Sequence, residues 1–74
     1  MAVETHAVAG VGTVTADVTG PVTVVQSGGP AGAYHLEDAN GYVNVTLAGV
    51  GEGQVWAARA KADADAVAAA FNAP

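Results

Sequence analysis

Cysteine is absent from this sequence of 74 residues, and its absence excludes disulfide bonds and thiolate metal sites together. The two histidines, His6 and His35, are too few to form a structural zinc site on their own. A domain of this length buries only about 60% of its unfolded surface, and small domains usually need disulfides, a metal or association with other chains. We therefore expect no metal and no other cofactor, and we expect the chain to be stabilised by packing against protein.

Basic residues are also scarce. Arg59 and Lys61 stand against seven acidic residues, which gives a formal net charge of −5. Nucleic-acid binding depends on neutralising phosphates, and anionic membranes attract basic segments, so neither kind of partner is expected. The sequence has no run of about 18 apolar residues that could span a bilayer. The first residues lack the basic start of a secretory signal, which favours synthesis in the cytoplasm.

Large apolar side chains are the third shortage. Alanine supplies 18 residues and valine 13, whereas leucine occurs twice and isoleucine not at all. Burial stabilises by about 25 cal/mol per Å² of apolar area, so a core of alanine and valine contributes little per residue. We interpret residues 1–74 as one domain that completes its core within an assembly.

Alternating apolar and polar residues predict a β-rich region over residues 11–48. In a strand over residues 11–19, one face carries Val14, Ala16 and Val18. Gly20 and Pro21 end this strand, and the short connection to residues 22–26 favours an antiparallel neighbour.

Two more strands are predicted over residues 33–37 and 42–48. Asn40-Gly41 between them is a strong hairpin signal, because both residue types accept positive φ. In the second of these strands, one face carries Val43, Val45 and Leu47.

The alanine-rich residues 52–72 predict a C-terminal helix, since alanine has the highest helix propensity. One stripe at helical spacing contains Trp56, Ala60, Asp63, Val67, Ala70 and Phe71. Two opposite-charge pairs at i,i+4 spacing are Arg59 with Asp63 and Lys61 with Asp65. The predicted fold class is α+β: a small antiparallel sheet or partly open barrel of four to five strands, followed by one helix.

Residues 1–10 are compatible with either a strand or an extended arm. As an arm they would reach onto a neighbouring subunit or the underlying shell, because they are apolar enough to pack and have no clear partner within the sequence. The side chains predicted to form an interface with other chains are Val3, Val8, Trp56, Val67 and Phe71.

Catalytic residues are not predicted. Ser27, the only serine, lies in a loop rich in glycine and proline and is interpreted as a turn residue. His35 precedes Glu37 and Asp38, which is compatible with a general base or a weak metal ligand, but a solvent-facing histidine on a strand is the commoner explanation. We would reconsider an enzyme only if a cleft around His35 gathered acidic groups from another chain. We therefore predict a protein that is not an enzyme, with no catalytic, cofactor-binding or metal-binding residues.

Strands rich in threonine, valine and glycine, together with Asn44-Val-Thr-Leu-Ala-Gly-Val50 leading into the closing segment, carry a family resemblance. Over about two-thirds of its length, the chain resembles the small head-decoration or capsid-cementing proteins of bacteriophages. The resemblance implies a homo-oligomer, with a trimer favoured, bound to a larger major capsid protein. It also implies a place in the virion and a structural, shell-stabilising role without a cofactor.

Two other functions remain open. One is a small soluble adaptor or inhibitor that binds a single protein by strand addition at the edge of the Asn40-Gly41 hairpin. The other is a subunit of a different homopolymer, such as a phage tail component or a cytoplasmic shell.

Overall fold

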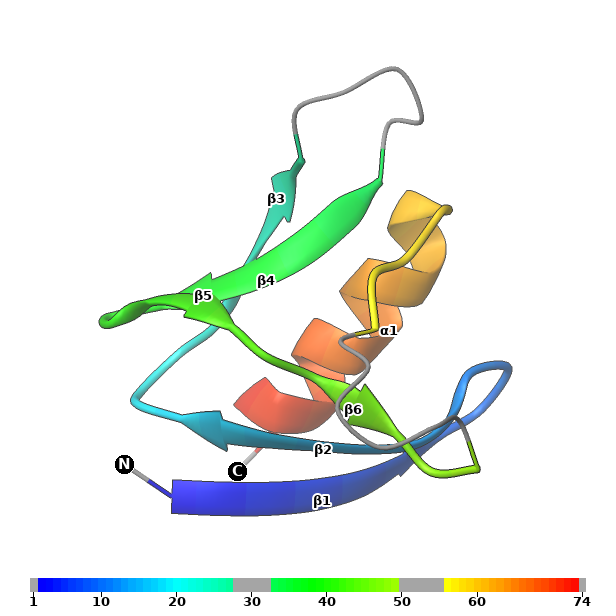
Figure 1. Ribbon diagram of the computed structural model, residues 1–74, viewed down its shortest axis with the longest axis horizontal. Helices are drawn as coiled ribbons and strands as arrows, with labels where there is room; N and C mark the ends of the chain where they lie inside the picture. The colour runs from blue at the N-terminus through cyan, green and yellow to red at the C-terminus, as the bar shows by residue number, and fades with distance from the viewer. Residues whose placement is uncertain (1, 28–32, 50–55, 74) are drawn as a thin grey trace.

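The computed structural model describes residues 2–27, 33–49 and 56–73, which form six strands and one helix. In chain order these are β1 (Ala2–Val8), β2 (Gly12–Val18), β3 (Thr23–Gln26), β4 (Tyr34–Asp38), β5 (Gly41–Val43), β6 (Thr46–Leu47) and α1 (Lys61–Asn72). The strands form two antiparallel sheets of three, which we call the first sheet (β1-β2-β6) and the second sheet (β3-β4-β5) (Figure 1). The predicted β-rich α+β class with one C-terminal helix is confirmed.

β1 is a strand of the chain's own sheet. It pairs with β2 along its whole length, from Ala2 opposite Val18 to Val8 opposite Gly12. The turn between them closes with a 3.0 Å hydrogen bond from the Val11 N–H to the Val8 carbonyl, and Gly10 supplies the positive φ that the turn needs. The predicted arm reaching onto a neighbour is therefore wrong, because this short turn folds the segment back onto β2.

The alternation predicted for β2 is confirmed. Val14, Ala16 and Val18 are buried, whereas Thr13 and Asp17 on the other face are exposed. The predicted antiparallel neighbour is wrong, however, because β2 lies between β1 and β6 while β3 belongs to the second sheet. The connecting residues after β2 carry the chain from one sheet to the other, so a short connection here does not form a hairpin.

The hairpin at Asn40-Gly41 joins β4 to β5, with Asp38 opposite Gly41. Of these two residues, only Gly41 adopts a positive φ, of 101°. The Asp38 carboxylate accepts a 2.8 Å hydrogen bond from the Asn40 N–H, which holds the turn without a left-handed asparagine.

The strand predicted over residues 42–48 is divided between the two sheets. Residues 41–43 pair with β4, and Thr46 and Leu47 pair with β2. The prediction that Val43 and Val45 share a face still holds, because both side chains are buried. Alternation therefore predicted the direction of each side chain but not the change of sheet.

The helix begins at Lys61, well after the predicted start at residue 52. Residues 52–55 lie outside the described part of the chain, and residues 56–58 are not helical. The Trp56 N–H donates to the Val45 carbonyl at 2.7 Å, and Ala58 and Tyr34 exchange two backbone hydrogen bonds of 2.8 and 3.0 Å. These bonds to the strands outweigh the helix propensity of alanine in this segment.

Because the helix starts later than predicted, its buried face differs from the predicted stripe. Its buried residues are Ala64, Val67, Ala68 and Phe71, at the spacing of one helical stripe. The predicted stripe is correct for Val67 and Phe71 and wrong for Ala60 and Asp63, which are exposed. Its phase was set from Trp56, which is not helical.

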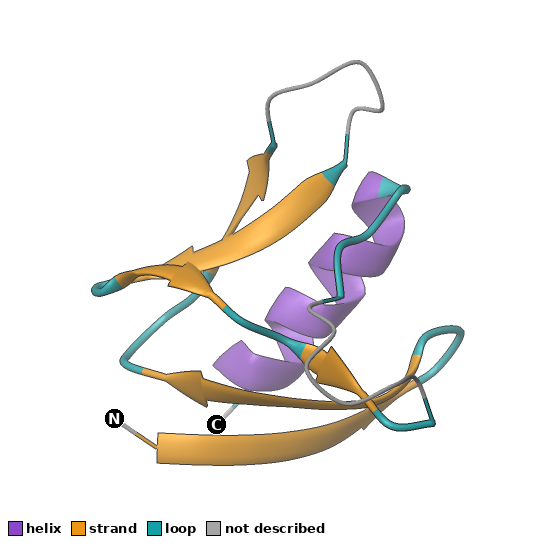
Figure 2. Cartoon of the chain, viewed as in Figure 1, coloured by secondary structure: helices purple, strands orange, loops and turns teal. Residues whose placement is uncertain are grey.

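The core lies between the two sheets and the helix, which packs against β1, β3 and β4 (Figure 2). The largest fully buried side chains come from four different elements or connections: Val14, Leu36, Val45 and Val67. Of the predicted ion pairs, the Lys61–Asp65 pair is confirmed at 2.9 Å, whereas Arg59 precedes the helix and cannot form an i,i+4 helical pair with Asp63. In the described residues, no helix is both long and apolar enough to cross a membrane.

Candidate functional site

The outer edge of β1 is the candidate interaction site. Within the residues that the structure describes, β1 pairs with β2 alone, and it forms the border of the first sheet (Figure 1). The Thr13 carbonyl of β2 accepts a 2.9 Å hydrogen bond from the Ala48 N–H on the β6 side. Successive residues of an antiparallel strand direct their backbone N–H and C=O groups to opposite neighbouring strands. The backbone groups of Val14 and Ala16 therefore point toward β1.

The same alternation fixes which groups of β1 face outward. His6 and Glu4 lie opposite Val14 and Ala16, so their backbone groups bond to β2. The N–H and C=O groups of Val3, Thr5 and Ala7 consequently point away from the sheet. We call this row of outward backbone groups the free edge.

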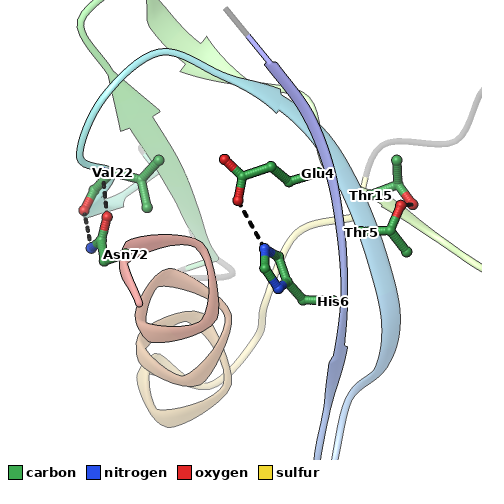
Figure 3. A network of polar contacts seen from close by, with 6 residues as sticks. All are labelled: Glu4, Thr5, His6, Thr15, Val22 and Asn72. Atoms are coloured by element: carbon green, nitrogen blue, oxygen red, sulfur yellow. Dashed lines mark hydrogen bonds and ion pairs between the residues drawn. The ribbon is translucent and has the colours of Figure 1, made fainter. Parts of the chain in front are cut away.

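The two faces of β1 differ in chemistry. On the face away from the helix, Val3 is 71% exposed, and Thr5 and Ala7 are also exposed. Thr5 and Thr15 share a 2.9 Å hydrogen bond between their hydroxyl oxygens across the strand pair (Figure 3). Short side chains of this kind leave the backbone of the free edge accessible.

The face toward the helix carries an acid and a base. His6 Nε2 and Glu4 Oε1 are 2.9 Å apart, and the two side chains point toward the C-terminal end of the helix (Figure 3). The His6 ring meets the ring of Phe71 edge to face at 4.9 Å. A shallow cleft of about 360 Å³ opens beside this pair and is lined by Glu4, Gly20, Pro21, Phe71 and Asn72.

A second histidine forms a separate polar network on the second sheet. His35 Nδ1 lies 2.6 Å from Ser27 Oγ, and His35 Nε2 lies 2.7 Å from Glu37 Oε2. The ring stacks on Tyr42 at 4.5 Å between centroids with the planes 18° apart. The His35 side chain is only 11% exposed, so the expectation of a solvent-facing histidine is wrong.

This network has the connectivity of an activated hydroxyl. When Glu37 accepts the Nε2 proton, Nδ1 of His35 is free to accept the hydroxyl proton of Ser27. Nucleophile, base and orienting acid then follow one another as they do in serine hydrolases. In the sequence, Ser27 and His35 lie eight residues apart, and no motif joins them. Strand alternation contained part of the signal, because His35 and Glu37 are two residues apart on one strand and therefore share a face.

The five residues predicted to form an interface lie in different environments. Val8, Val67 and Phe71 are buried in the chain's own core, and Phe71 also lines the cleft beside Glu4. Trp56 is half-buried and packs against the same core. Val3 alone is both predicted and widely exposed, and it lies beside the free edge.

Compared with known proteins, the chain matches no family model, no curated protein and no solved structure.

Proposed function

We propose that this chain is a non-enzymatic structural protein of a large assembly, and that its assembly is the bacteriophage head, where it decorates and stabilises the shell. The observation that carries the assembly role is the free edge of β1. The narrower assignment to a phage head rests on the resemblance of the Thr/Val/Gly strands and of residues 44–50 to bacteriophage head-decoration proteins.

The free edge supports protein binding because a long unpaired strand is a ready template for another strand. Proteins that avoid such contacts place lysine or proline on edge strands, keep these strands short, or direct charged side chains inward. Glu4 is an inward-pointing charge of this kind, and it contacts His6 at 2.9 Å. β1 has seven residues, Ala-Val-Glu-Thr-His-Ala-Val, and contains neither lysine nor proline. Its outward groups are therefore suited to main-chain hydrogen bonding with a protein partner.

The alternative adaptor would bind at the Asn40-Gly41 hairpin, whose outer strand is β5. β5 has only three residues, against seven in β1, so it offers a much shorter ladder for strand addition. The edge of β1 is for this reason the better binding site under either function.

The outer face of the first sheet supports the same proposal. It combines Val3 with exposed threonines on β1, β2 and β6, and the Thr46 hydroxyl donates to the Thr15 carbonyl at 3.3 Å. Asp17 is the one charged residue on this face in the described strands. A nearly uncharged surface of short side chains can lie flat on another protein.

The test is to recover the chain from its native source by gradient sedimentation and to measure its copy number per particle by mass spectrometry. The proposal predicts that the chain sediments with particles far larger than itself, in a fixed ratio to a major shell protein. Recovery only as a free chain or in a one-to-one complex with a small partner would contradict it and favour the adaptor.

A second candidate function is favoured by one observation, the Ser27–His35–Glu37 network. In an acyl transfer, Ser27 Oγ would bond to an ester carbonyl carbon while its proton passes to His35 Nδ1. The leaving alkoxide would take that proton, and water would then hydrolyse the acyl-serine. The residues that line the described cleft are not part of this network.

Hydrolysis of p-nitrophenyl acetate by the full chain tests this second function. If it is correct, Ser27→Ala abolishes the rate above that of free imidazole, whereas Thr13→Ala, which removes an exposed hydroxyl from the first sheet, leaves it unchanged. Equal rates for the parent chain and Ser27→Ala would exclude it.

A further inference from the structure

We propose that β1 pairs with β1 of a second copy of this chain, antiparallel and around a two-fold axis that passes through Thr5. The two first sheets would become one continuous sheet of six strands. This inference rests on the proposed assembly function and names the chain itself as the partner at the free edge. Identical edges joined by a two-fold axis form a closed contact, which limits growth at this edge to a pair.

The length of β1 fits this register. With Thr5 opposite Thr5 of the second copy, Val3 lies opposite Ala7, Glu4 opposite His6 and Ala2 opposite Val8, so every residue of the seven-residue strand has a partner. Val3, Thr5 and Ala7 are the residues whose backbone groups form the free edge. In this register they face one another, so their N–H and C=O groups meet in the hydrogen-bonded pairs of an antiparallel ladder.

Charge complementarity favours the same register. Glu4 and His6 lie on the helix side of β1 and already contact each other within one chain at 2.9 Å. In the pair, each Glu4 faces His6 of the second copy, which gives a row of alternating acids and histidines. If the axis passed through Glu4, that carboxylate would face its own copy, and like charges directly opposite are destabilising.

The outer face is complementary as well. Val3 is the most exposed large apolar side chain of the described residues, and the pair places it beside Ala7 of the second copy. Threonine opposite threonine is a favourable cross-strand pair. The register therefore covers Val3 without bringing two bulky side chains together. A trimer, expected from the family resemblance, would have to use another surface.

Cysteine cross-linking tests the axis directly, because the chain has no cysteine of its own. Thr5→Cys would face itself across the axis at a Cα separation of about 5.5 Å, within the range of a disulfide. Val3→Cys is the matched control on the same face. Its symmetry mate lies four residues along the strand, about 14 Å away.

The expected result is rapid disulfide dimer formation by Thr5→Cys under mild oxidation and at least a tenfold slower reaction by Val3→Cys. A mixture of Val3→Cys and Ala7→Cys should form the mixed disulfide, because these positions face each other. Equal cross-linking rates for Thr5→Cys and Val3→Cys would overturn the proposed axis.

Sedimentation equilibrium of the full chain supplies a test that does not depend on oxidation. The pair predicts a mass of about 14 kDa, twice the 7.2 kDa of one chain, and a melting temperature that rises with concentration. Thr5→Pro removes an outward N–H that β2 does not use and should give a monomer, whereas Thr5→Ala keeps the N–H and should remain paired.

Failure of this inference and failure of the proposed function are distinguishable. A full chain that stays at 7.2 kDa at all concentrations overturns the self-pairing, even if the chain is recovered in large particles. A chain that pairs in solution and is never recovered in a particle overturns the proposed function and leaves the pairing established.

Discussion

Asn72, the last residue of the helix, joins the C-terminus of the chain to the connection between the two sheets. Its Oδ1 accepts a 2.8 Å hydrogen bond from the Val22 N–H, and its Nδ2 donates a 2.9 Å hydrogen bond to the Val22 carbonyl (Figure 3). Val22 itself is buried. We predict that Asn72→Ala destabilises the whole fold, because this one amide satisfies both backbone groups of a residue that belongs to neither sheet.

The size of the effect follows from these two bonds. Each hydrogen bond contributes about 1 kcal/mol net, and a buried backbone group left without a partner adds a further penalty of about 1 kcal/mol. Alanine is the better helix former and returns about 0.5 kcal/mol. The expected loss is about 2–3 kcal/mol, a large fraction of the roughly 4–11 kcal/mol expected for a domain of this length.

Urea denaturation followed by circular dichroism measures this loss. Asn44→Ala is the matched control, because Asn44 is exposed and should change the free energy of unfolding by no more than about 0.5 kcal/mol. Asn72→Asp keeps the acceptor and loses the donor, so it should remain destabilised. If Asn72→Ala unfolds at the same urea concentration as Asn44→Ala, the amide does not hold the two parts together and the reasoning fails.

Three further predictions use the same denaturation assay. Leu36→Ala removes a fully buried side chain and should lower the free energy of unfolding by about 3 kcal/mol; a loss below about 1 kcal/mol would place Leu36 outside the core. Gly41→Ala adds a Cβ at a φ of 101° and should destabilise by about 1–2 kcal/mol, whereas Ala39→Gly should change less. Asp65→Asn breaks an exposed ion pair with Lys61 and should change stability by at most about 0.5 kcal/mol, a difference that disappears in about 1 M salt.

The parts of the fold that could be predicted from the sequence depend on neighbouring residues alone. Alternation placed Val14, Ala16 and Val18 inside, and Asn40-Gly41 marked a true hairpin. These signals are local, because side-chain direction in a strand and the geometry of a tight turn are set within a few residues.

The errors arise where distant segments compete for backbone groups. Trp56 and Ala58 lie in a segment whose alanine-rich composition favours a helix. Their N–H groups nevertheless donate to the Val45 and Tyr34 carbonyls. The division of the strands between two sheets is decided in the same way, by which distant carbonyl and N–H groups each segment meets. Local propensity carries no information about such partners.

The candidate site could be predicted only in part for the same reason. Val3 was predicted as an interface residue because the apolar residues near the N-terminus had no clear partner within the sequence. The free edge itself follows from the order β1-β2-β6, which no local pattern specifies. Likewise, Glu37 could be assigned to the face of His35 from their spacing, but the approach of Ser27 to His35 Nδ1 depends on how β3 pairs with β4.

The shortage of large apolar residues connects the core to the free edge. In the described residues, the largest fully buried side chains are one leucine and three valines, so the interior contributes little per residue and each additional strand pairing matters more to stability. The inner face of β1 carries the polar residues Glu4 and His6, which contact each other, whereas a core rich in large apolar side chains would have apolar residues at these positions. Pairing at the free edge would add backbone hydrogen bonds, cover Val3 and give both polar side chains a second partner. A chain poor in large side chains is therefore stabilised more readily by extending its sheet than by enlarging its core.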